Sequence, residues 1–237
     1  MRAWLNLRHA DSERAQAFSK GLERLGYLVV HGLTCIPAAG DVLVTWNRIG
    51  HGDTAARAFE GHGRPVIVAE NASWGNSFCG GSWLMLARSF HNMAGMFPVG
   101  GPDRWDSLGV DLEPWRTEGE TVILPQRGIG PAQVAMPRGW PYGIKGRIRQ
   151  HPGRRQAKDL KEDLAKASKV ITWGSGAAVK ALIWGIPVES HMPKWIGTQD
   201  NTNSGRLEMF RRLAWAQWSM DEIASGEPFE RLLRWSC

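Results

Sequence analysis

The stretch VITWGSGAAVKALIWGIPV, residues 170–188, decides the fold. It predicts four elements in turn: a buried strand over 169–173, a tight turn at 174–176, a helix over 177–184 and a second strand from 186. Gly185 suits the left-handed position that ends a helix. Strands that alternate with helices in this way are typical of a parallel sheet.

The same alternation continues on both sides of this stretch. In the second half of the chain we expect strands at 121–125 and 146–150, and helices at 157–167 and 206–224. In the first half we expect strands at 2–7, 27–30, 41–46 and 65–69, with helices at 11–25, 53–61 and 83–90. Most of these strands are continuously apolar, which indicates that helices cover both faces of each sheet.

The chain therefore has an α/β fold in two halves. Its 237 residues allow one large domain or two small ones. The boundary is expected within PWRTEGE, residues 114–120. We expect a first domain over 1–118 and a second over 119–205.

Composition excludes several classes of protein. Apolar residues make up 43% and charged residues 22%, an ordinary balance that argues against disorder. There is no apolar run long enough to span a membrane and no pattern of a secretory leader. Cys35, Cys79 and Cys237 lie too far apart for a disulfide framework or a zinc pattern, which favours the reducing cytoplasm.

The charge balance and the tryptophan content point to the kind of partner. The net charge is +6 and the chain holds 13 tryptophans. Positive charge predicts an anionic partner such as a nucleotide, a nucleic acid or a membrane surface. Tryptophan faces can stack on bases or sugars, although most of the 13 are expected in the core or at interfaces.

The turn Gly174-Ser175-Gly176 is a candidate phosphate site. Amides at the start of the next helix, including that of Ala177, and the helix dipole attract anions. Glycine lets the backbone approach a phosphate closely, and Ser175 adds a hydroxyl. Lys180 is misplaced for a P-loop, and the turn lacks the third glycine of GxGxxG. The alternative is a tight turn in which the glycines serve packing alone.

Further polar residues follow the strands of the second half, where ligands of open α/β sheets bind. They are Arg127, Gly128, Arg149, His151 and Glu189. Glu189 suits a bidentate contact with sugar hydroxyls, and His151 suits donation to a phosphate; a solvated carboxylate and a turn residue are the alternatives. The run 145–158 holds six Lys and Arg and no acid. It is either a solvated face or a patch for pyrophosphate or nucleic acid.

These motifs resemble the C-terminal half of GT-B glycosyltransferases, with the nearest likeness to the capsular-polysaccharide and Kdo-transferase-like branch. The likeness rests on the serine-glycine turn, on Gly185-Ile-Pro-Val188 and on the dipeptide His151-Pro152, and it covers about residues 121–190. It implies two small Rossmann-like halves that face a cleft, with C-terminal helices over 206–237 packing back on the first. It also implies a nucleotide-diphosphate sugar as co-substrate, a UDP-sugar first, in the second half. Without a DxD motif, we expect neither a metal ion nor another cofactor.

The resemblance places the acceptor and any base in the first half, across the cleft. The candidates for acceptor binding are Asn47, Arg48, Asn71 and Trp74, and those for the base are Glu70 and His91. Glu70 ends a buried strand, and a histidine titrates near neutrality. A structural role in a loop is the alternative for His91. Retaining chemistry needs no protein base, so the stereochemical outcome stays open.

The expected acceptor is a 5-hydroxymethylated pyrimidine in double-stranded phage DNA. The segments TWNRIG (45–50) and AENASWGN (69–76) resemble small phage-encoded proteins, and an enzyme acting on a base in a duplex has to expose it. A glycan or a lipid-linked acceptor is the alternative. Two other classes also stay open: a non-catalytic binder of nucleotides or nucleic acids, and a Rossmann oxidoreductase, which the incomplete glycine fingerprint weakens.

Overall fold

The computed structural model describes residues 1–7, 12–90, 94–130, 132, 134–151 and 158–234. The chain forms two compact units. Unit 1 comprises Met1–His91, Gly95–Gly100 and Ala214–Cys237, and unit 2 comprises Asn92–Ala94 and Gly101–Leu213. The main passage into unit 2 thus falls at residue 101, earlier than the expected boundary at 118, and residues 206–213 belong to unit 2.

Unit 1 is built on a six-stranded sheet in the order β10-β5-β4-β3-β1-β2. Its strands are β1 (Arg2–Asn6), β2 (Leu28–His31), β3 (Val42–Trp46), β4 (Val66–Asn71), β5 (Trp83–Arg88) and β10 (Gln217–Ser219). The first four are parallel, whereas β5 is antiparallel to β4 and β10 is antiparallel to β5. The predicted parallel sheet therefore carries an antiparallel edge.

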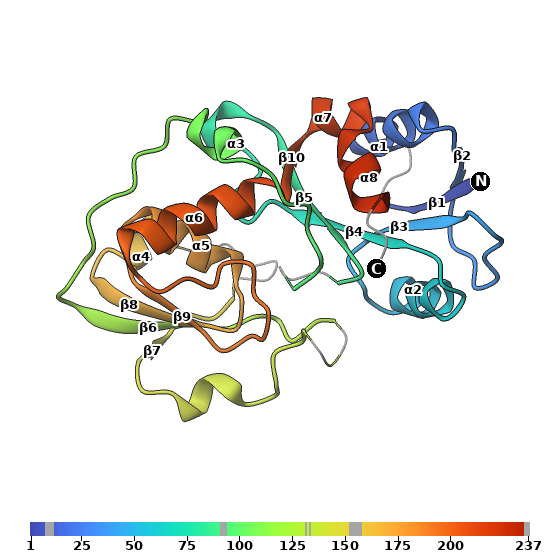
Figure 1. Cartoon of the computed structure of the whole chain (residues 1–237). Helices are drawn as coiled ribbons and strands as arrows, with labels where there is room; N and C mark the ends of the chain where they lie inside the picture. The colour runs from blue at the N-terminus through green and yellow to red at the C-terminus, as the bar shows by residue number, and fades with distance from the viewer. Residues whose placement is uncertain (8–11, 91–93, 131, 133, 152–157, 235–237) are drawn as a thin grey trace. The chain divides into compact units, whose positions relative to one another are not determined.

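Helices cover both faces of this sheet (Figure 1). They are α1 (Glu13–Arg24), α2 (His51–Gly61), α7 (Met220–Ser225) and α8 (Glu227–Leu233), with a 3-10 turn η1 (Phe78–Gly80). Helices α1, α7 and α8 pack on one face over Val42, Val44 and Ile67. Helix α2 packs on the other face over Leu43 and Val68. Successive residues of a strand point to opposite faces, so continuous apolar runs become buried on both sides.

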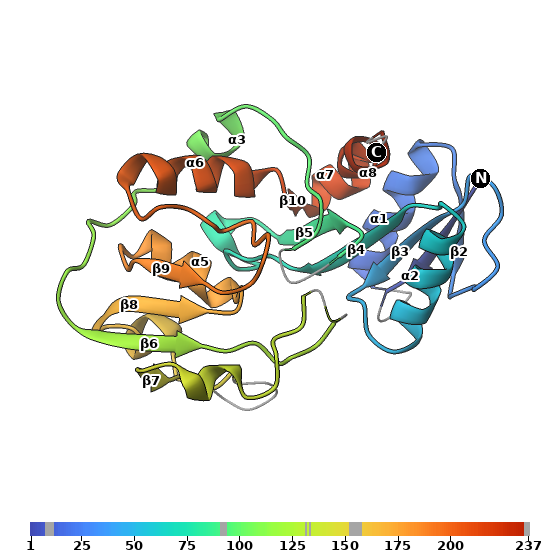
Figure 2. The same cartoon turned by 60° about the horizontal axis from the view of Figure 1, so that its bottom comes forward.

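Unit 2 has a parallel sheet in the order β7-β6-β8-β9. Its strands are β6 (Glu120–Leu124), β7 (Arg147–Ile148), β8 (Ala167–Thr172) and β9 (Val188–Ser190). Its helices are α3 (Asp103–Asp106), α4 (Leu160–Asp163), α5 (Gly176–Ile183) and α6 (Asn203–Ala214), with a 3-10 turn η2 (Trp140–Gly143). Figure 2 shows these strands running side by side. The prediction of an α/β fold with two Rossmann-like halves is confirmed.

Two predicted helices are wrong. Residues 83–88, WLMLAR, form strand β5 between β4 and β10, and four of their side chains are buried on the two faces of the sheet. An apolar run of this length suits a buried strand as well as a buried helix. The helix expected over 206–224 ends at Ala214, and β10 then joins the edge of the unit 1 sheet. Ser219 and Glu222 start α7 with a capping box.

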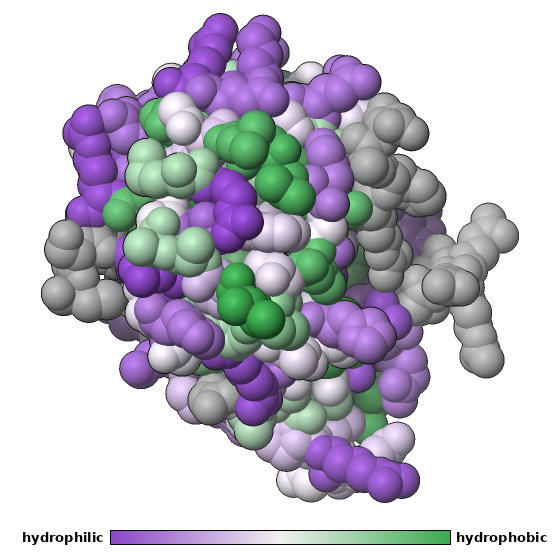
Figure 3. Space-filling model, turned by 90° about the vertical axis from the view of Figure 1, so that its right-hand side faces the viewer, coloured by the Kyte–Doolittle hydropathy of each residue, from purple (hydrophilic) through white to green (hydrophobic). Residues whose placement is uncertain are grey.

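Contact with a membrane would require apolar helices or apolar side chains on the surface. Within the described ranges, none of the helices combines the length and the apolar character needed to cross a bilayer. Among the large apolar side chains that are exposed, Ile36 and Leu28 belong to unit 1. On the face drawn in Figure 3, apolar residues are interspersed with polar ones.

Asp41 ties the start of β1 to the start of β3 through its hydrogen bonds with Arg2 and Trp4. It is 1% exposed. Burial alone would raise its pKa, but hydrogen bonds from Arg2, the Ala38 amide and the Trp4 indole outweigh burial and lower the pKa to about 2. A depressed pKa gives stability above the pKa of the unfolded chain, about 4, that is lost as the pH falls towards 2.

We therefore expect Asp41→Asn to lower the free energy of unfolding by about 2 kcal/mol at pH 7. The gap to the wild type should close between pH 4 and pH 2, as urea denaturation at a series of pH values would show. Glu23→Gln, on an exposed position of α1, is the control and should show no such convergence. A gap for Asp41→Asn that does not change with pH would contradict this role.

Candidate functional site

The predicted phosphate turn lies at the carboxyl end of β8, next to the end of β6. The sheet order reverses between these two strands, and open α/β sheets bind ligands at this point. Thr172 is buried there and holds the two ends together. Its hydroxyl donates to the Leu124 carbonyl at 2.9 Å and accepts from the Ser175 amide at 2.9 Å. The position and the shape of the turn are thus fixed by the sheet.

The start of α5 uses some of its amides internally. Ser175 is the N-cap, and its hydroxyl oxygen accepts from the Ala177 amide at 3.3 Å. The Ala178 amide donates to the Ser175 carbonyl at 3.0 Å. Among the described residues, the amide of Gly176 has no hydrogen-bond partner. An anion would therefore meet the Gly176 amide and the helix dipole, a smaller set of donors than the sequence suggested.

Gly174 has a packing role. Its φ is +69°, and a Cβ there would lie 2.6 Å from Met192 Cε. Gly176 differs, because it lies within the regular helix α5. Of the two glycines, Gly174 is explained by the turn itself, whereas the helical backbone at Gly176 accepts any ordinary residue.

Cationic and imidazole side chains gather at the ends of β6 and β7. Arg127 is exposed and forms no ion pair within the described part of the chain. The Arg149 side chain is largely buried and forms an ion pair with Asp163. Its guanidinium also donates to the Lys158 carbonyl at 3.2 Å. Partial burial and the charges of Arg127 and Arg149 lower the pKa of His151. The three side chains thus lie close enough to interact electrostatically, with Arg127 the cation best placed for a ligand.

Glu189 lies on β9, next to β8, and is hydrogen-bonded to neighbouring polar side chains. It accepts from Lys169 Nζ at 2.8 Å and from His191 Nε2 at 2.9 Å, and these bonds lower its pKa. The indole of Trp140 donates to His191 Nδ1 at 3.1 Å, so the imidazole carries its proton on Nε2. Glu189 is half exposed, and its carboxylate has lone pairs left for hydroxyl donors.

The sequence prediction missed several residues of this edge. Lys169 and Trp140 are distant from Glu189 along the chain, and the parallel pairing of β8 with β9 brings Lys169 to it, whereas His191 follows Glu189 by two residues. Gln126 is a further candidate that the sequence prediction missed. It lies two residues after the end of β6, and its Oε1 atom is buried and lacks a hydrogen-bond partner among the described residues.

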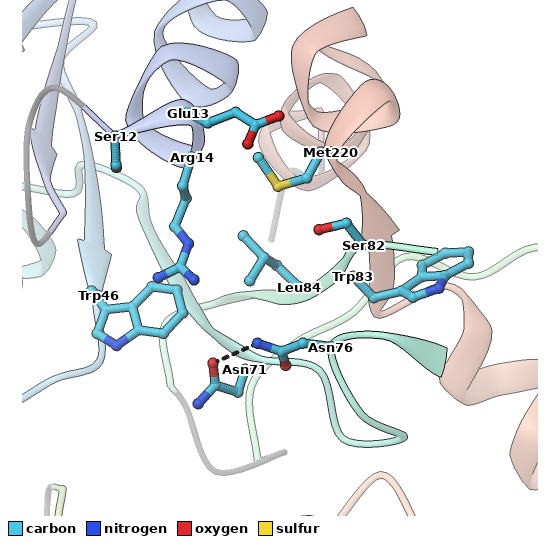
Figure 4. Close-up of a pocket in the computed structure, with 10 residues that line it drawn as sticks. All are labelled: Ser12, Glu13, Arg14, Trp46, Asn71, Asn76, Ser82, Trp83, Leu84 and Met220. Atoms are coloured by element: carbon cyan, nitrogen blue, oxygen red, sulfur yellow. Dashed lines mark hydrogen bonds between the residues drawn. The ribbon is translucent and has the colours of Figure 1, made fainter. Parts of the chain in front are cut away.

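Unit 1 has a cavity of its own at the carboxyl ends of its parallel strands. Its volume is about 490 Å³. The residues that line it are Ser12, Glu13, Arg14, Trp46, Asn71, Asn76, Ser82, Trp83, Leu84 and Met220 (Figure 4). The Arg14 guanidinium lies over the Trp46 ring at 4.2 Å from its centre. Asn71, predicted to bind the acceptor, lines this cavity and accepts from Asn76 Nδ2 at 3.0 Å.

Two residues predicted at the acceptor are corrected by their burial. Arg48 is 3% exposed, and its guanidinium donates to Asp53, to Glu60 and to the Ser89 carbonyl. Trp74 is 2% exposed and stacks on Phe78. Both side chains therefore pack inside unit 1, and their burial leaves almost no surface for the predicted contact with an acceptor.

The other residues predicted in the first half are placed as follows. Asn47 has a φ of +62°, and its amide donates to the Ala69 carbonyl at 3.0 Å. Glu70 is partly buried on β4, and neither it nor Asn47 is among the residues that line the cavity. His91 lies outside the described residues. Gly128 follows Arg127 as an exposed residue with a φ of +66°.

Across the described ranges, no three His, Cys, Asp or Glu side chains come together as metal ligands. No family model matches the chain, and neither does any curated protein. Among solved structures, KpsC from Thermosulfurimonas dismutans, a beta Kdo 2,4 transferase, has a TM-score of 0.53 at 14% identity, covering 91% of this chain and 90% of that chain.

A second solved structure matches a similar share of the chain. Ligand-free aspartate transcarbamoylase from Trypanosoma cruzi covers 91% of this chain and 82% of its own at 16% identity, but its TM-score is 0.24. The likeness to KpsC concerns the fold alone, and it agrees with the Kdo-transferase-like resemblance seen in the sequence.

Proposed function

We propose that this protein is a glycosyltransferase that moves a sugar from a nucleotide-diphosphate sugar to a hydroxyl group. The observation that carries the proposal is the unpartnered Gly176 amide at the start of α5, held by Thr172 at the point where the unit 2 sheet reverses. The fold likeness to a Kdo transferase supports the same class of reaction.

In this proposal unit 2 binds the donor. The diphosphate accepts from the Gly176 amide and the Ser175 hydroxyl, and Arg127 and His151 lie on neighbouring strand ends. Negative charge builds up on the diphosphate as the bond to the sugar breaks, and a fixed amide, a helix dipole and a cation stabilise that charge. Glu189 and Gln126 Oε1 accept from hydroxyl or amino groups of the nucleoside.

The acceptor binds the cavity of unit 1. An inverting transfer needs a base close to the acceptor hydroxyl. Glu13 lines the cavity and Glu70 does not, so we propose Glu13 ahead of Glu70 for this role. His91 remains the other candidate for the base that the sequence predicts.

The identity of the acceptor is a separate part of the proposal. Two of the six cations in the basic run 145–158 are held by acids, since Arg147 pairs with Glu120 and Asp163 and Arg149 pairs with Asp163. This pairing lowers the charge available to a DNA backbone. We therefore rank a sugar-like acceptor above a hydroxymethylated pyrimidine in DNA.

A ligand screen on the wild-type chain tests the class of reaction. A UDP-sugar or a CMP-sugar at 100 times its Kd should raise the free energy of unfolding by about 2.7 kcal/mol, measured as a thermal shift. Mass spectrometry then follows sugar transfer to glycans and to duplex DNA that contains 5-hydroxymethylcytosine. Stabilisation by NAD alone would contradict the proposal, and nucleotide-sugar binding without transfer to any acceptor would indicate a non-catalytic binder.

A further inference from the structure

We infer that the cavity of unit 1 binds an anionic, hydroxylated ring compound, with Arg14 as the group that recognises its carboxylate or phosphate. The role of this compound as the sugar acceptor rests on the proposed function. Its binding to the cavity does not, because every residue in the argument belongs to unit 1.

Among the described residues, Arg14 is a cation without an acidic partner. Its guanidinium is partly buried over Trp46, and no carboxylate of the described residues forms an ion pair with it. Burial lowers the pKa of Arg14. Arg2, on β1, and Arg48, two residues after the end of β3, are each paired with an aspartate.

An unpaired cation in a cavity is a binding group. Taking a charge out of water is unfavourable unless an opposite charge or hydrogen bonds replace the lost solvent. The planar guanidinium matches the two oxygens of a carboxylate or phosphate, and stacking on Trp46 holds that plane in place. An anionic ligand would supply the partner that Arg14 lacks among the described residues.

The rest of the lining fits a hydroxylated ring. The amides of Asn71 and Asn76 lie side by side on the floor, and hydroxyls come from Ser12 and Ser82 (Figure 4). The hydrogen bond from Asn76 uses the Asn71 oxygen and leaves the Asn71 N–H groups for a ligand. A volume of about 490 Å³ suits a compound of monosaccharide size with one charged substituent.

The anion is expected at one end of the cavity. In Figure 4 the Arg14 side chain points toward Trp46, whereas the Glu13 carboxylate points toward Met220. The negative charge of Glu13 repels the acidic group of the ligand, so the ring hydroxyls are expected on the side of Glu13. This separation of charges gives the ligand a defined orientation, with its acidic group on Trp46 and Arg14.

Calorimetric titration of the full chain tests the inference with three probes: glucuronate, glucose 6-phosphate and glucose. At least one of the two acids should bind about tenfold more tightly than glucose, and high salt should reduce that preference. The acid that binds identifies the preferred group. Binding of glucose as tightly as both acids, or no binding of any probe, would overturn the inference.

Two arginines of the same helix provide the variant and its control. Arg14→Gln should abolish the preference for the acid, whereas Arg24→Gln, at the exposed last turn of α1, should leave it unchanged. Arg14→Lys keeps the charge and should retain part of the preference, and thermal melts check that each variant folds. Equal acid binding by Arg14→Gln and the wild type would contradict the role of Arg14.

The two proposals fail in different ways. Acid binding that depends on Arg14, in a chain that transfers no sugar, would remove the proposed function and leave the anion site standing. Sugar transfer that is unaffected by Arg14→Gln, with neutral acceptors used as well as acidic ones, would remove the anion site alone.

Discussion

Gly185→Ala is expected to lower the free energy of unfolding by about 4 kcal/mol, the largest loss of stability foreseen for a single methyl group. Gly185 ends α5 with a φ of +69°, and the amides of Gly185 and Ile186 donate back to Leu182 and Ala181. A Cβ at this position would lie 1.9 Å from the Pro114 carbonyl oxygen. Because that atom belongs to the backbone, the segment before β6 has to move.

Gly109→Ala is the control that separates the strain of a left-handed backbone from the steric clash with Pro114. Gly109 has a similar φ of +60° in the same unit, and a Cβ there meets nothing within 4 Å. We expect it to cost about 1 kcal/mol, the usual strain of a left-handed residue. Urea denaturation of both variants gives the difference. Equal losses would show that the contact with Pro114 relaxes freely.

The fold was predictable where hydrophobic pattern and turn chemistry agree. Strands of five or six apolar residues and the glycines at 174 and 185 located β8, α5 and β9 to within two residues. The pattern failed where the edge of the unit 1 sheet is built from distant segments. Strand β10 is three residues long and gains its stability from pairing with β5, more than 100 residues earlier.

The candidate site was predictable only in part, for a similar reason. The phosphate turn is local in sequence, and its motif was visible. The pair Arg14 and Trp46 comes from the start of α1 and the end of β3, and their contact depends on the strand order of the sheet. Arg48 was assigned to a ligand because it follows a strand, whereas its partners Asp53 and Glu60 lie on α2.

Gly176→Val is expected to weaken nucleotide-sugar binding about 100-fold, or about 2.7 kcal/mol. Gly176 is the first residue of α5 and has helical dihedral angles, so the backbone does not require glycine there. A branched side chain beside an amide that binds phosphate blocks the close approach of the diphosphate. Calorimetric titration with UDP and with the nucleotide sugar found in the ligand screen measures the loss.

The free energy of unfolding distinguishes a phosphate-binding role of Gly176 from a packing role. Gly176→Ala should keep or raise the free energy of unfolding by up to about 1 kcal/mol, because alanine favours a helix over glycine, while it still weakens nucleotide binding. Gly143→Val, at an exposed glycine of unit 2 whose Cβ would meet nothing within 4 Å, is the control for binding. If Gly176→Val binds nucleotide as the wild type does, the start of α5 is a structural turn and the donor site lies elsewhere. If both Gly176 variants lose stability instead, glycine at this position serves packing, and the unpartnered amide no longer supports a donor site.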